Sequence, residues 1–143
     1  MLTIVGFRSR DDDRAILLAL GRAMNAAWPG VFEDEDFKPR RRGFSCYVAD
    51  AGDWQEHVQG TIDFLEECGE IFARAARVGI RVMFDTAIWP EDRAAQGRVR
   101  VTFPPSLMAL LGASGALFLV SDYVGADDRP PRPAGEDEDE DEV

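Results

Sequence analysis

The sequence predicts an α/β (α+β) fold, a two-layer sandwich in which a mixed or antiparallel sheet carries its helices on one face. Short segments of alternating or branched apolar residues, typical of strands, are interleaved with segments whose apolar residues recur every three or four positions, typical of helices. The connections are short, and no long parallel-strand runs are present, which favours a mixed or antiparallel sheet. The predicted order is β-α-β-α-β-β-α-β.

Length and charge divide the chain into two parts. The 143 residues, 45% of them apolar, support one globular domain, which we place at residues 1–125. The net charge of −11 is concentrated near the C-terminus, where seven consecutive acidic residues occupy positions 136–142. Without these seven, the chain has 20 acidic and 16 basic residues. We therefore predict a disordered, Pro-rich and acidic tail at residues 126–143.

The first part of the domain begins with a predicted buried strand at Leu2–Phe7. A helix follows, capped by Ser9 or Asp11, and Trp28-Pro29-Gly30 stops it. The residues predicted on the inner side of this helix are Ile16, Leu17, Leu20, Met24 and Ala27.

The segment Val31–Gly43 contains an acidic block, Glu33–Asp36, followed by a basic block that includes Lys38 and Arg40–Arg42. Opposite charges with few apolar anchors predict an exposed loop. Its two halves either pair weakly with each other in solvent or form a binding loop for a ligand or partner.

A long helix at Trp54–Val78 is the element around which the rest of the domain is organised. Its apolar residues form one stripe, Asp53 can cap it with Glu56 completing a capping box, and Gly79 ends it. A strand at Phe44–Ala49 precedes it, with Phe44, Cys46 and Val48 on one face and Ser45, Tyr47 and Ala49 on the other.

The second part of the domain is predicted to contain three strands and a short helix. Ile80–Ile88 and Arg98–Phe103 are expected to form an antiparallel hairpin. Pro104-Pro105 then begins a helix at Ser106–Leu111, which Gly112 closes. The last strand covers Ala116–Val120 and extends to Tyr123.

No catalytic, metal or nucleotide motif stands out, so we expect no cofactor, no metal site and, on balance, no enzyme. His57 and Cys68 are separated by eleven helical residues, about 16 Å, which is too far for a shared metal or a hydrogen bond. We interpret His57 as a boundary residue and Cys68 as a buried structural thiol. Arg81, Arg98 and Arg100 without a lysine-rich stripe do not predict nucleic-acid binding.

The candidate partner-binding residues are acidic and lie on the predicted outer face of the long helix. Either this face is simply solvated, or it docks a basic partner. Glu70 and Arg74 are predicted to form an ordinary surface pair. Tyr47 and Trp89, if exposed, would also mark an interface. The five acidic candidates are Glu56, Asp63, Glu66, Glu67 and Glu70.

Two segments carry a resemblance to a known family. The run Val101–Tyr123 and the helix segment Trp54–Leu65 resemble the bacterial family called domain of unknown function 4279. The similarity extends over about residues 2–123, but the family's leucine-glycine-x-x-proline stretch is replaced here by Val31–Arg42. The resemblance implies an α/β sandwich and brings no established activity. Some relatives of such small domains are toxin-neutralising immunity proteins, which fits an acidic cytoplasmic protein.

Three functions follow as hypotheses. The first is a non-enzymatic, acidic protein-binding domain, in its most specific form an immunity-type inhibitor of a basic toxin. The alternative is a small-molecule-binding domain or enzyme with a site near the 31–43 loop, using Arg40, Arg41, Arg42 or His57. The third is a homodimer made through an exposed sheet face or edge. Two cysteines, Cys46 and Cys68, do not make a disulfide framework, and we see no export signal and no bilayer-length apolar run. We therefore expect a cytoplasmic protein without membrane contact.

Overall fold

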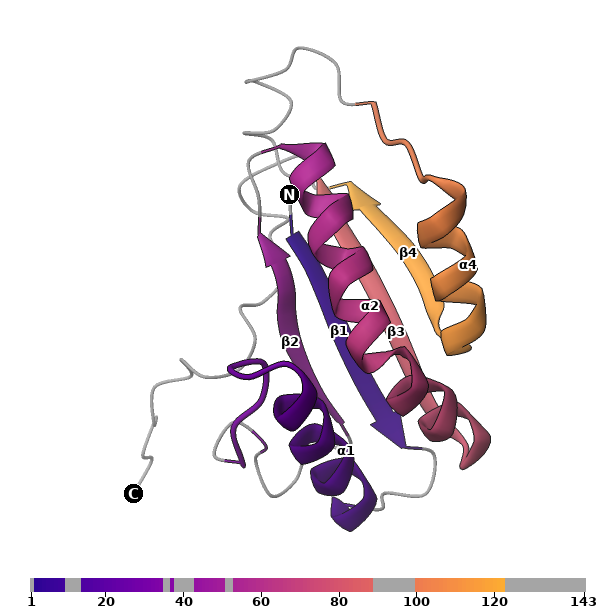
Figure 1. Cartoon of the computed structure of the whole chain (residues 1–143). Coiled ribbons are helices and arrows are strands. Elements are labelled where there is room, and N and C mark those ends of the chain that lie inside the picture. The colour runs from indigo at the N-terminus through magenta and orange to yellow at the C-terminus, as the bar shows by residue number, and fades with distance from the viewer. Residues whose placement is uncertain are drawn as a thin grey trace.

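The computed structural model describes residues 2–9, 14–34, 37, 43–50, 53–88 and 100–122. Within these residues the chain folds as a mixed α/β domain of helices and strands, as predicted (Figure 1). The predicted tail, the basic block of the 31–43 segment and Trp89 lie outside the described residues. The elements in chain order are β1 (Leu2–Ser9), α1 (Arg14–Ala27), β2 (Gly43–Asp50), α2 (Trp54–Arg77), β3 (Ile80–Ile88), α4 (Pro105–Ser114) and β4 (Leu117–Asp122).

The strands form one four-stranded sheet in the order β2-β1-β3-β4. β1 is antiparallel to both of its neighbours, whereas β3 and β4 are parallel. The sheet is therefore mixed, as the sequence predicted. α1, α2 and α4 lie on the same face of the sheet (Figure 1). We call the opposite face, on which none of the described helices lies, the open face.

The helix α2 confirms the prediction for residues 54–78 closely. It runs for 24 residues, and the Asp53 side chain accepts a hydrogen bond from the Gln55 N–H at 3.2 Å, which caps the helix. At its other end Gly79 adopts a φ of 82°, a left-handed conformation that glycine takes without steric cost. The capped, amphipathic pattern thus gives a helix of the expected length and position.

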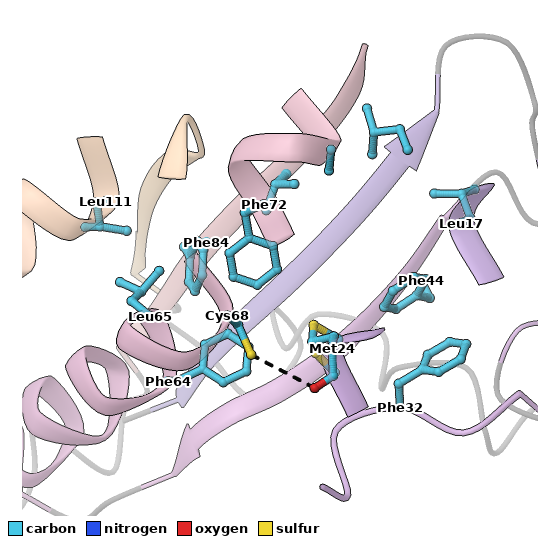
Figure 2. Close-up of a cluster of buried hydrophobic side chains, with 14 of the residues drawn as sticks. Leu17, Met24, Phe32, Phe44, Phe64, Leu65, Cys68, Phe72, Phe84 and Leu111 are labelled. Atoms are coloured by element: carbon cyan, nitrogen blue, oxygen red, sulfur yellow. Dashed lines mark hydrogen bonds between the residues drawn. The ribbon is translucent and has the colours of Figure 1, made fainter. Parts of the chain in front are cut away.

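The core lies between α2 and the sheet (Figure 2). The ring of Phe72 is 5.7 Å from Phe64 and 5.5 Å from Phe84 of β3, centroid to centroid. All three phenylalanines are fully buried. Offset and edge-to-face contacts of this kind are worth about 0.5–1.5 kcal/mol beyond the area that they bury. They fix the rotation of α2 over the sheet.

The predicted strand at Arg98–Phe103 and its hairpin with β3 are wrong for the residues that the structure describes. Residues 100–103 are not in a strand, and the second neighbour of β3 is β4. Phe103 reaches the core without a strand partner, because its ring packs edge-on against Trp54 at 5.5 Å and against Phe118 at 4.9 Å. The Trp54 indole N–H donates to the Thr102 carbonyl at 2.9 Å, so it occupies an acceptor that a sheet ladder would have used.

The helix α4 is longer than predicted. It continues through Gly112 to Ser114, and Gly115, with a φ of 67°, ends it instead. The Ser114 hydroxyl donates to the Leu111 carbonyl and accepts from the Ala116 N–H, which satisfies two backbone groups at this end. The left-handed glycine, rather than the first glycine in the sequence, therefore marks the boundary.

The helix α1 buries Leu17 and Met24, as predicted, and ends before Trp28. Ile16, which was predicted on the inner side, is instead 37% exposed. Gly21 is buried as well, on the side of α1 where the ring of Phe32 lies directly against it. The apolar stripe is therefore narrower than the sequence pattern indicated.

The prediction that the 31–43 segment is an exposed loop with few anchors is wrong at two residues. Phe32 and Phe37 are buried, and both rings contact Phe44 of β2, at 4.6 and 6.0 Å. The Arg14 guanidinium lies 4.3 Å over the Phe37 ring and donates to the Phe37 carbonyl. These two rings fasten the described part of the segment to the core.

Candidate partner-binding face

The acidic candidates lie together on the outer face of α2. At 3.6 residues per turn, all five fall within an arc of about 100°, spread over roughly 21 Å of the helix axis. All five are exposed, and the buried residues of α2 occupy the opposite side. We call this surface the acidic face, made of Glu56, Asp63, Glu66, Glu67 and Glu70.

Charge is not uniform along the acidic face. Glu70 accepts hydrogen bonds from Arg77 at 3.0 Å and from Arg74 at 3.5 Å. These bonds, that from Arg77 first, lower the pKa of the Glu70 carboxyl. The predicted Glu70–Arg74 pair is thus confirmed, and Arg77 completes it. The C-terminal end of the face is therefore neutralised within the chain.

The other four carboxylates of the acidic face have no basic partner among the described residues. Asp63 accepts from the Gln59 amide at 2.7 Å, a neutral partner that holds the side chain without cancelling its charge. Within the described residues, no basic side chain forms an ion pair with Glu56, Glu66 or Glu67. Four negative charges therefore remain on one rigid helix surface, in a form that a basic protein can approach.

His57 is buried rather than at the boundary, which corrects the sequence interpretation. It is only 2% exposed, and its ring stacks on Trp54 with centroids 5.3 Å apart. The hydroxyl of Thr61, which lies one turn further along α2, donates to the His57 carbonyl. His57 lies on the buried side of α2, away from the acidic face, so the two do not form a common site.

Cys68 is a structural thiol, as predicted. It is fully buried, and its Sγ lies 4.0 Å from the Met24 carbonyl oxygen of α1 (Figure 2). Burial, and secondly the nearby charge of Glu67, raises the pKa of the Cys68 thiol to about 11. At neutral pH the thiol is therefore protonated and a poor nucleophile. Cys46 is likewise buried and is not part of a disulfide.

The described residues contain neither a metal site nor a membrane-spanning helix. No group of three or more His, Cys, Asp or Glu side chains is placed there to hold a metal ion. No helix in that part of the chain has the length and apolar character needed to cross a bilayer. The arginines at 40–42 proposed for a small-molecule site lie outside the described residues.

Sequence reasoning only partly anticipated a second surface, on the open face of the sheet. Tyr47 of β2 is 43% exposed, whereas Trp89, with which it was predicted to mark an interface, lies outside the described residues. Leu117 and Leu119 of β4 are also exposed, and they alternate with Phe118, which packs towards the helices. The period of two along a strand could have indicated that Leu117 and Leu119 face away from the helices. It was missed because the run Ala116–Val120 is uniformly apolar, which is typical of a strand buried on both faces.

Comparisons with protein-family models, with curated proteins and with solved structures found no match. The resemblance to the domain of unknown function 4279 family therefore stays a prediction, and the function has to be argued from the geometry.

Proposed function

We propose that this chain is a non-enzymatic, acidic protein-binding domain whose acidic face on α2 docks a basic protein. The observation that carries the proposal is the set of four exposed carboxylates, Glu56, Asp63, Glu66 and Glu67, without basic partners in the described part of the chain. They are held on one capped helix, so the backbone that carries them is already ordered before a partner binds.

The chemistry of such a surface favours fast and selective association. Carboxylates on one side of a rigid element attract a basic partner over about a Debye length, roughly 8 Å at physiological salt. Exposed charges contribute more to association rate and selectivity than to affinity. The proposal therefore includes an association rate that falls as the salt concentration rises.

The most specific form of the proposal is an immunity-type inhibitor that covers the basic substrate-binding surface of a toxin. The resemblance described above and the acidity of the chain support this form. A small-molecule site near the 31–43 segment remains the alternative. The buried Phe32 and Phe37 and the protonated Cys68 thiol give it no support among the described residues.

A charge-matched pair of variants tests the proposal. The helix variant carries Glu56→Gln, Asp63→Asn, Glu66→Gln and Glu67→Gln. The tail variant changes Glu136, Glu138, Glu140 and Glu142 to Gln, so both lose the same charge. Each immobilised protein is exposed to lysate of the source cell at physiological salt, and retained proteins are quantified by mass spectrometry.

The expected result is a basic protein retained by the wild type and by the tail variant but lost with the helix variant. Retention that is equal for all three proteins, or the absence of any specifically retained basic protein, contradicts the proposal. Where a basic protein is retained, co-expression decides the inhibitor form: the wild type relieves the toxicity of that protein, and the helix variant does not.

A further inference from the structure

We draw no further inference here: the strongest candidate, the open face of the sheet with the exposed side chains of Tyr47, Leu117 and Leu119, carries none, because nothing among the described residues shows what covers it.

Discussion

Phe32 lies with its ring against the bare backbone of Gly21, so that a Cβ at Gly21 would be only 2.6 Å from two of the ring carbons. This contact joins the segment after α1 back onto α1 itself. Phe32 in turn packs on Phe44 of β2, with ring centroids 4.6 Å apart. The absence of a side chain at one helical position therefore allows the loop to reach the sheet.

Gly21→Ala is expected to lower the free energy of unfolding by about 1–3 kcal/mol, because the added methyl group displaces the Phe32 ring from a packed core. Urea unfolding measures the change. Gly69→Ala in α2 is the matched control, since a Cβ there meets nothing within 4 Å. The control should gain up to about 1 kcal/mol from improved helix propensity. Equal effects at the two glycines would contradict the role assigned to Phe32.

Asp53→Ala is expected to destabilise the domain by about 1 kcal/mol, because the first turn of α2 loses the carboxylate that accepts from Gln55. Asp53→Asn retains a capping oxygen and should lose much less. Thermal or urea unfolding of the two variants gives the comparison. If Asn and Ala cost the same, the capping bond contributes little to stability.

The buried thiol of Cys68 should make the domain less stable in alkali. Its pKa is raised from 9.0 to about 11 in the folded chain, so the unfolded state ionises first as the pH rises. The stability that the neutral thiol contributes is fully present below pH 9 and is lost as the pH rises towards about 11. Urea unfolding over this range should show a steeper decline for the wild type than for Cys68→Ala.

The same thiol should react slowly with alkylating reagents in the folded protein. A rapid reaction of Cys68 at neutral pH, followed by mass spectrometry, would show that the thiol is accessible and ionised, contrary to its burial. Unfolding in urea should restore the ordinary rate.

The Arg22–Asp34 pair connects α1 to the segment that follows it, and the Asp34 carboxyl accepts from the Arg22 guanidinium. This hydrogen bonding holds the pKa of Asp34 below its ordinary value of 3.8. A lowered carboxyl pKa stabilises the fold above that ordinary value, and the contribution disappears as the pH falls through the folded-state pKa. Carboxyl titration by NMR should show the pKa of Asp34 returning towards 3.8 in Arg22→Gln. An Asp34 pKa that is the same in the variant and in the wild type would contradict the pairing.

The sequence was most informative where one element could be judged alone. The position of α2, its Asp53 cap and the exposure of its five carboxylates all follow from a helical period that a single segment displays. The Glu70–Arg74 pair was predictable for the same reason, because residues four apart meet on any helix.

The errors arose where long-range contacts decide the outcome. Residues 98–103 alternate like a strand, but alternation only tells which side chains face the core. Phe103 is drawn to Trp54 and Phe118 instead of to a strand partner. Phe32 and Phe37 stand alone between charged blocks, so no periodic pattern indicated their burial. The open face depends on the sheet order, which sequence periodicity does not determine.

The edge strand β4 has one more consequence. Residues 101–121 contain no ionisable side chain, yet Leu119 and Val120 of β4 are exposed. Natural sheets usually protect such edges with lysine, proline or a β-bulge. The strand at the other edge, β2, has a protection of this kind, because its register with β1 is irregular. Colloidal stability must then come from charge elsewhere. Residues 126–143 supply most of the net charge, because deleting them removes nine acidic and two basic residues and changes the net charge from −11 to −4. A truncated chain should therefore precipitate at concentrations that the full chain tolerates, even if it folds equally well.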